Sequence, residues 1–135
     1  MALLEIIVEG TPISHQTRNR AALKAWQKIV RDQAATHWNG PPRHEKMKLT
    51  VIYFHRGSKA GLDHDNMVKP IQDALNRLVY EDDRQITHAE IAQLSLDETV
   101  EVPNVTRAIV EGLARGEDFL WIQVELAPTE KERKD

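Results

Sequence analysis

Hydrophobic residues alternate with polar ones, or form short unbroken runs, in four segments of the chain. A period of two residues is typical of strands, whose side chains point to opposite faces of a sheet. The second segment is almost continuously apolar, so we expect it at the centre of the sheet. The four predicted strands span residues 3–8, 47–54, 85–96 and 119–126.

Three other segments repeat their apolar residues every three or four positions, as amphipathic helices do. They span residues 21 to about 37, 66–78 and 105–114. Trp26 lies on the apolar stripe of the first helix, so we expect it in the core rather than stacked on a nucleic-acid base.

The third predicted helix lies in a segment of some twenty residues before the last strand. We expect Pro103 and Asn104 to cap it and Gly116 to close it. Its apolar side should pack on the core, with a dimer contact or a substrate lid as alternatives. That side consists of Val105, Ile109, Val110 and Leu113.

These elements predict an α/β (α+β) fold, a single small domain with a mixed β-sheet flanked by helices. A chain of 135 residues with 41% hydrophobic content can build one core. We expect the domain to span residues 1–127 and the charged segment 128–135 to be a disordered tail.

Acidic residues surround one lysine in the middle of the chain. Asp63 and Asp65 stand at the start of the second predicted helix, and Lys69 follows Asp65 by one turn on the same face. Asp82 and Asp83 come after the helix, at a turn that leads into a strand. A helix start and a strand start can meet at one sheet edge, so these side chains are expected to converge.

Carboxylates in this number suit a hard metal ion that acts on a phosphate. Mg²⁺ and Mn²⁺ take oxygen ligands, and two or three carboxylates suffice where a phosphate completes the coordination shell. An EF-hand is excluded, because Met67, Val68 and Ala74 stand where an acceptor, a glycine and a glutamate are required. Taken singly, an Asp before a helix or in a turn is more often structural, so the joint pattern carries the hypothesis.

The segment around these acids resembles the RusA family of Holliday junction resolvases. The signature of that family runs D-x-D-N-x-x-K-x-x-x-D-A-L, followed shortly by D-D-x-Q-[VI]. The resemblance covers roughly residues 62–86, and outside them it extends to the order of the elements. The matching residues are Asp63, Asp65, Asn66, Lys69, Asp73, Ala74, Leu75, Asp82, Asp83, Gln85 and Ile86.

The resemblance implies a metal-dependent nuclease that acts on branched DNA. Asp63, Asp65 and Asp83 would be the metal-binding catalytic carboxylates, with Asp82 beside them, and Lys69 would be essential for catalysis. The implied cofactor is Mg²⁺ or Mn²⁺. The implied substrate is a four-way junction, and two symmetric cuts in it imply a twofold homodimer.

The chain departs from the family pattern at three places. Gln93 stands where many relatives carry a lysine. Some twenty residues separate the last two strands, where relatives have a short turn. Pro70 follows Lys69, and proline in a helix interior removes a backbone hydrogen bond. We therefore expect the helix to begin at Asn66 or Met67, with Asp65 or Asn66 as its cap.

The net charge of -3 is unusual for a nucleic-acid enzyme, but the charge is unevenly distributed. Residues 14–59 contain ten Lys and Arg against two acids, a local net of +8, so the remainder carries -11. This basic stretch is the candidate grip for DNA phosphates, although much of its charge could simply be solvated. The candidate DNA-binding residues are Ser14, Gln16, Arg18, Arg20 and Lys59.

Other features narrow the compartment and the chemistry. No stretch is long enough to span a bilayer, and the start lacks the pattern of a signal peptide, so we expect a cytoplasmic protein without a membrane partner. The absence of cysteine excludes disulfides and thiolate metal sites. The six histidines form no ligand pair, and His64 is expected to be an exposed neighbour of the site.

Two alternatives to junction resolution remain. The protein could be a related nuclease for replication forks or flaps, an option that the missing cation at Gln93 keeps open. It could also be a non-catalytic DNA-binding or assembly subunit, although retention of all the acids and Lys69 argues against this.

Overall fold

Four strands form one mixed sheet in the computed structural model, which describes residues 2–57, 62–98, 101–102 and 105–129. The strands are β1 (Ala2–Glu9), β2 (Met47–His55), β3 (Ile86–Ser95) and β4 (Phe119–Leu126). Their order is β1-β4-β2-β3. β4 is antiparallel to both of its neighbours, whereas β2 and β3 are parallel. The predicted mixed sheet, with the apolar segment 47–54 in an inner strand, is confirmed.

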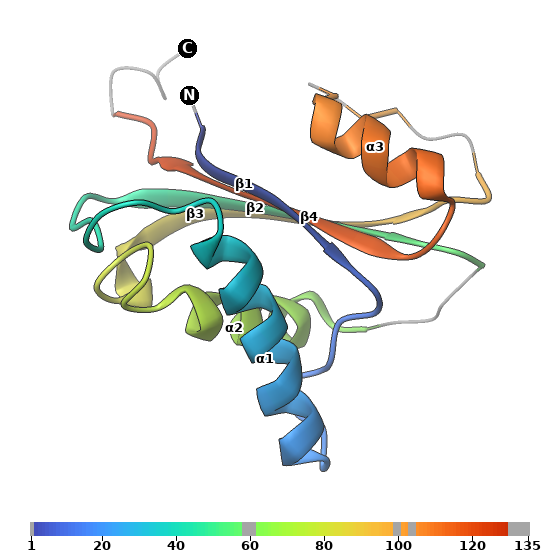
Figure 1. The fold of residues 1–135 in the computed structure, drawn as a ribbon, viewed down its shortest axis with the longest axis horizontal. Coiled ribbons are helices and arrows are strands. Elements are labelled where there is room, and N and C mark those ends of the chain that lie inside the picture. Colours follow the sequence, from blue (N-terminus) through green and yellow to red (C-terminus); the bar gives the residue numbers. More distant parts are fainter. Residues whose placement is uncertain (1, 58–61, 99–100, 103–104, 130–135) are drawn as a thin grey trace.

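Three α-helices in the described residues cover the two faces of this sheet. α1 (Arg20–Ala35) and α2 (His64–Leu75) lie on one face, and α3 (Arg107–Arg115) lies on the other (Figure 1). A short 3-10 helix, η1 (Asp83–Gln85), precedes β3. The molecule is thus a small single domain of the α+β class.

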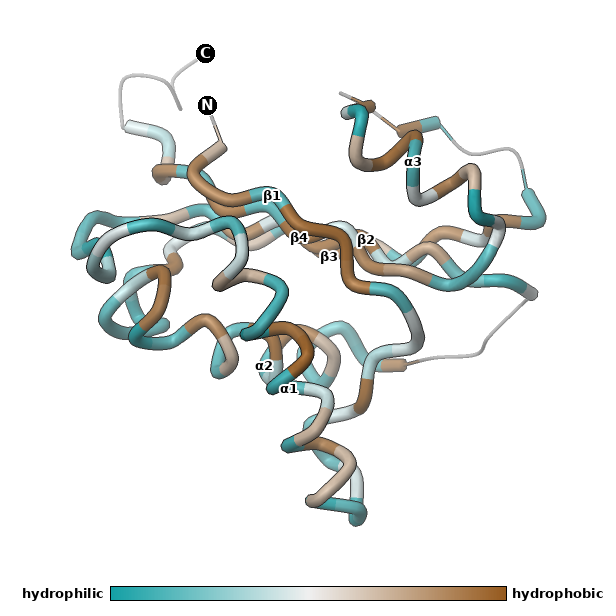
Figure 2. Tube along the Cα trace, viewed as in Figure 1, coloured by the Kyte–Doolittle hydropathy of each residue, from teal (hydrophilic) through white to brown (hydrophobic). Residues whose placement is uncertain are grey.

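The main hydrophobic core lies between the sheet and the helices α1 and α2. Trp26 of α1 is 4% exposed and belongs to this core, as its apolar stripe predicts. The most hydrophobic stretches of the chain run through the strands at the centre of the molecule (Figure 2). A second, smaller cluster fills the space under α3 and consists of Phe54, Ile109, Phe119 and Trp121.

The C-terminal end of α2 is attached to α1. The guanidinium of Arg31 donates from Nη1 to the carbonyls of Ala74 at 2.9 Å and Asn76 at 2.8 Å. A helix leaves its last carbonyl groups without partners inside the helix, and a cation there also suits the helix dipole. One basic residue of the segment 14–59, although exposed, therefore holds the end of α2.

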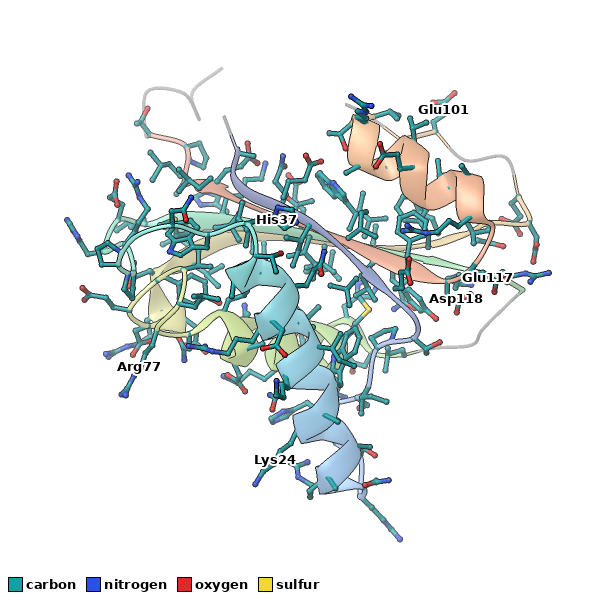
Figure 3. The ribbon with its side chains drawn as sticks, in the orientation of Figure 1. Lys24, His37, Arg77, Glu101, Glu117 and Asp118 are labelled. Atoms are coloured by element: carbon teal, nitrogen blue, oxygen red, sulfur yellow. The ribbon has the colours of Figure 1, made fainter. Side chains whose placement is uncertain are left out.

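Asp118 connects three segments where β2 ends and β4 begins (Figure 3). Its carboxylate accepts hydrogen bonds from the Tyr53 hydroxyl at 2.7 Å and from the Arg56 amide at 2.9 Å. Thr11 donates to the same carboxylate, and the Gly10 amide donates to the Asp118 carbonyl. These bonds hold the end of β2, from which the chain continues toward α2.

The bounds of the acidic helix differ from the expected ones. α2 begins at His64, with Asp63 as its cap, and not at Asn66 or Met67 with Asp65 or Asn66 as the cap. It ends at Leu75 instead of residue 78, because Arg77 adopts a positive φ of 63°, which a helix cannot contain. Pro70 therefore lies in the interior of the helix and not near its first turn.

The helix before β4 also starts later than expected. Thr106 is its cap, and its side chain accepts a hydrogen bond from the Ile109 amide, while Gly116 closes the helix in the left-handed conformation. Pro103 and Asn104 lie outside the described residues. Ile109 is buried, as expected, but Val105 and Val110 are about half exposed, so the expected apolar side is only partly correct.

Two further expectations concern the C-terminal tail and membrane-spanning segments. Residues 130–135 of the expected disordered tail lie outside the described part of the chain. Within the described ranges, no helix is both long enough and apolar enough to cross a bilayer.

Candidate nuclease site

Asp63 and Asp65 form the start of α2. The Asp63 carboxylate accepts a hydrogen bond from the Asp65 amide at 3.0 Å, and the Asp63 carbonyl accepts one from the Met67 amide at 3.0 Å. An Asp cap satisfies amide groups that the first turn leaves free. Both side chains are exposed, so their remaining carboxylate oxygens face solvent. His64 between them is exposed, as expected.

Lys69 connects α2 to the second acidic pair. Its ammonium group lies 2.9 Å from Oδ2 of Asp83 and 3.1 Å from Oδ1 of Asp73. Its side chain is 43% exposed, whereas that of Asp83 is 22% exposed. The hydrogen bonds to Asp83 and Asp73 raise the pKa of Lys69 above its usual range. Lys69 therefore stays protonated at any physiological pH.

The negative field of these carboxylates also reaches the core beneath them. Tyr80 is fully buried, and its hydroxyl donates to the Gln72 carbonyl at 2.7 Å. Burial raises the pKa of Tyr80, and the charges of Asp83 and Asp73 raise that pKa further. The site thus combines a concentrated negative charge with one partly compensating cation.

Gln85 holds the turn that carries Asp82 and Asp83. Its side-chain oxygen accepts hydrogen bonds from the amides of Glu81 at 2.9 Å and Asp82 at 3.0 Å. Its side-chain nitrogen donates to the carbonyls of Arg43 and Glu45, just before β2. The Gln of the sequence motif therefore attaches the acidic turn to the sheet.

Asp82 stabilises the same turn through its side chain. Its carboxylate caps η1 and accepts a hydrogen bond from the Arg84 amide at 2.9 Å, with the Arg84 guanidinium also close. The backbone hydrogen bond, and then the side-chain bond from Arg84, lower the pKa of Asp82. Asp82 is therefore anionic and is committed mainly to its turn.

The helix start and the strand start do not meet as expected. The side-chain nitrogen of Gln93, near the end of β3, donates to the Leu62 carbonyl directly before Asp63 at 2.5 Å. Asp83, in contrast, is the first residue of η1, which directly precedes β3. The helix that links two parallel strands has to run back along them, so its beginning lies level with the end of β3. Lys69, inside the helix, makes the contact with Asp83.

A cavity opens beside Asp65 and Lys69, between α2 and β3. Val68 and Ile91 contribute apolar walls, and His15, Asn66 and Gln72 contribute polar ones. His15 comes from the polar loop 14–19, which therefore lies against the acidic helix. This open cavity brings apolar and charged side chains together beside Asp65 and Lys69.

The polar loop is fastened to α2 and braced from within. The His15 amide donates to the Asn66 carbonyl at 2.8 Å. Arg20 donates to the carbonyls of His15 at 2.8 Å and Thr17 at 3.2 Å. Arg20, expected as a DNA contact, thus also has a structural function, whereas Arg18 and Gln16 have exposed side chains.

The remaining candidate DNA-binding residues are Ser14, which the structure describes, and Lys59, which it does not. Ser14 is partly buried, and its hydroxyl accepts a hydrogen bond from the Gln16 amide at 3.1 Å, which shapes the loop. Lys59 lies outside the described residues. Lys24, on the part of α1 next to the loop, points away from the rest of the molecule (Figure 3).

The donor atoms of the site suit a hard cation. Asp63, Asp65 and Asp83 offer carboxylate oxygens, the ligand type that Mg²⁺ and Mn²⁺ prefer. Over the described ranges, no group of three or more His, Cys, Asp or Glu side chains is already placed to hold a metal ion. Lys69 takes the place of such a cation between Asp73 and Asp83.

Reasoning from the sequence missed the roles of His15 and Gln72, and it identified Gln93 only as a departure from the family pattern. His15 and Gln72 line the cavity, and Gln93 positions the segment before Asp63. Pro70 was a usable signal for His15, because a proline inside a helix leaves the carbonyl four residues earlier without its helical partner. The sequence carries no comparable signal for Gln72.

Comparison with known proteins supports a nucleic-acid enzyme. A family model described as Endodeoxyribonuclease RusA matches residues 9–103. The matched segment includes the polar loop, α2, η1 and β3, and so contains the entire candidate site. A search of curated proteins found no match.

Proposed function

This chain belongs to the RusA endodeoxyribonuclease family, and we propose that it is a metal-dependent endonuclease that resolves four-way DNA junctions in recombination and repair. One observation carries the proposal beyond the family match. Lys69 contacts Asp73 and Asp83 and lines a cavity together with Asp65, so a DNA backbone in this cavity would lie beside the cation and one acid of the motif.

Asp63, Asp65 and Asp83 would hold Mg²⁺ or Mn²⁺, with Asp82 beside them. When bound, such an ion polarises a phosphoryl oxygen and lowers the pKa of a coordinated water. The chain itself prepares this site by concentrating carboxylates at an exposed helix start and in a turn held by Gln85. Repulsion between the carboxylates favours binding of a cation.

Lys69 would stabilise charge on the phosphate during cleavage. Its raised pKa keeps it protonated, and its position one helical turn after Asp65 places it on the same face of α2. A cation directed at developing negative charge stabilises a transition state more than the ground state. In the free protein the same charge limits repulsion between Asp73 and Asp83.

The polar loop would grip the DNA backbone beside the site. Ser14, Gln16, Arg18, Arg20 and Lys59 are the proposed contacts. Their sequence segment, residues 14–59, carries a local net charge of +8, and the loop lies against α2 through the bond between His15 and Asn66. Because a four-way junction requires two symmetric cuts, we further propose that the protein acts as a twofold homodimer.

The decisive experiment compares DNA substrates with one purified protein. Labelled four-way junction, fork, flap and linear duplex are incubated with Mg²⁺, with Mn²⁺ or with EDTA. The proposal expects paired symmetric cuts in the junction, none in EDTA, and a dimer in solution by light scattering. Failure to cut any substrate would contradict the nuclease assignment and favour a DNA-binding or assembly subunit.

A nuclease for forks or flaps is the second candidate function. Gln93 supports it, because a neutral amide stands where many relatives have a lysine, and this amide is engaged with the Leu62 carbonyl. The site then offers one positive charge fewer to the DNA phosphates. Faster cutting of forks or flaps than of junctions would favour this candidate.

A further inference from the structure

Pro70 explains how the polar loop is fastened beside the candidate site. In an α-helix the carbonyl of residue 66 accepts a hydrogen bond from the amide of residue 70. Proline has no amide hydrogen, and its ring pushes against the carbonyl four residues earlier. The Asn66 carbonyl is therefore left for another donor, and the His15 amide fills this place at 2.8 Å.

The free carbonyl at Asn66 results from Pro70 inside the helix and not from the end of the helix. Pro70 lies in the interior of α2, where proline is unfavourable, and its ring is buried. The donor to the Asn66 carbonyl is the amide of His15, which lies 51 positions before Asn66 in the chain. His15 lines the cavity together with Asp65 and Lys69. An unfavourable residue in the helix thus fixes a wall of the site.

Hydrogen bonds within the loop couple its other residues to this attachment. Arg20 donates to the carbonyls of His15 and Thr17, the Thr17 amide donates to the Ser14 carbonyl, and the Asn19 side chain caps α1. Fixing the His15 amide therefore fixes the whole loop. Within the described residues, Nδ1 of His15 is buried and has no hydrogen-bond partner, so no side-chain bond at that atom replaces the amide bond.

We propose that Pro70 is a positioning residue for DNA binding: by leaving the Asn66 carbonyl to His15, it holds the polar loop 14–19 against α2, with His15 lining the cavity beside Asp65 and Lys69. The proposal rests on the proposed function, because the loop matters to catalysis only if DNA occupies this cavity. Pro70 contacts no reacting atom and acts through His15 and the loop.

The test is Pro70→Ala, which restores an amide that competes with His15 for the Asn66 carbonyl. Ile71→Val is the matched control, because it alters the packing of the same helix by one methyl group and leaves the backbone donors unchanged. Hydrogen exchange of the His15 amide is measured by NMR without DNA or metal. Four-way-junction cleavage with Mg²⁺ is measured separately, as kcat and KM.

We expect His15 exchange to accelerate about tenfold or more in Pro70→Ala, while amides of β2 keep their rates and the melting temperature does not fall. KM should rise about tenfold and kcat should stay within about threefold, because the carboxylates and Lys69 remain in place. Ile71→Val should change neither His15 exchange nor KM.

An unchanged His15 exchange rate in Pro70→Ala, with normal cleavage by wild type, would overturn this proposal alone. Faster His15 exchange in Pro70→Ala with an unchanged KM would also overturn it, because weakening the attachment of the loop would then have no effect on DNA binding. A wild-type protein that neither binds nor cleaves branched DNA would overturn the proposed function and the role of Pro70 in it. The exchange rates would still report whether Pro70 governs the attachment of the loop.

Discussion

Lys69 and Asp83 are 14 residues apart in the sequence, and their side chains meet at 2.9 Å. This contact joins the acidic helix to the turn before β3, so the two halves of the sequence motif form one surface. It also means that an acid of the proposed metal site is paired with a lysine before any ion or DNA binds.

Replacing Asp65 with Asn tests the proposed metal ligands. The change removes one negative charge with almost no change in shape, so junction cleavage should fall to background while junction binding stays equal or becomes tighter. Glu111→Gln on α3 is the control, because it makes the same chemical change on the other face of the sheet and should leave cleavage unaltered. Cleavage by Asp65→Asn within a few-fold of wild type would remove Asp65 from the metal site.

Replacing Lys69 with Met tests the role of the cation. Without Lys69, Asp73 and Asp83 lose their partner, and a phosphate loses a nearby positive charge. We expect cleavage to fall by about a hundredfold or more. Mg²⁺ should then bind more tightly, because repulsion between the carboxylates is no longer offset, and isothermal titration calorimetry measures this. Weaker Mg²⁺ binding together with unimpaired cleavage would show that Lys69 has another function.

Wild type and Lys69→Met should differ in how their free energy of unfolding depends on pH. The pKa of Lys69 is raised in the folded protein, so its ion pairs stabilise the fold below the usual lysine pKa near 10.5 and this contribution is lost as pH rises through the folded-state value. The side chain is 43% exposed, so solvent screening limits the effect to about half a kcal/mol. Urea unfolding from pH 8 to 11 should show the two proteins converging at the alkaline end. If the difference in unfolding free energy between the two proteins stayed constant with pH, it would come from packing of the side chain and not from its charge.

Binding of Mg²⁺ should raise the melting temperature of the wild-type protein. A ligand that binds only the folded state stabilises it by about 1 to 3 kcal/mol at roughly ten to a hundred times its dissociation constant. The double variant Asp63→Asn/Asp65→Asn should lose most of this response. If wild type and the double variant responded equally, the ion would bind elsewhere on the molecule.

Arg18 offers the cleanest test of the DNA grip, because Arg20 also braces the loop. Arg18→Ala should weaken junction binding by about threefold to tenfold and lower the slope of log affinity against log salt by about one unit. Unfolding free energy should change by less than about half a kcal/mol. Arg107→Ala, on α3, is the control and should change neither the junction affinity nor the slope of the salt dependence. An unchanged slope for Arg18→Ala would place the DNA on another surface.

Much of the fold and of the site could be predicted because the deciding signals are local. The apolar run before His55 predicts an inner strand, and the stripe that includes Trp26 predicts a buried helix face. The motif around Lys69 likewise predicts which charged residues share a face. In these cases neighbouring residues determine the outcome through periodicity and burial.

Features that depend on distant partners could not be predicted. Pro70 is acceptable inside α2 because His15, far away in the sequence, satisfies the freed carbonyl. Asp83 meets Lys69 and not the helix start, because α2 runs back along β2 and β3. Arg31 is one of the ten basic residues in the segment 14–59, and its guanidinium binds carbonyls at the end of α2. Each outcome requires knowledge of which elements pack together.

The sheet order also has a consequence for the synthesis of the protein. β4 is the last strand along the chain, but it lies between β1 and β2, and Ala2 pairs with Glu125. A nascent chain on the ribosome therefore carries β1 without a neighbour in the described sheet until residues 119–126 have been made. Closing so large a loop is slow. The acidic helix and the β2–β3 pair are complete in sequence earlier, so the full domain, and with it any cutting of DNA, should appear only after its final strand leaves the exit tunnel.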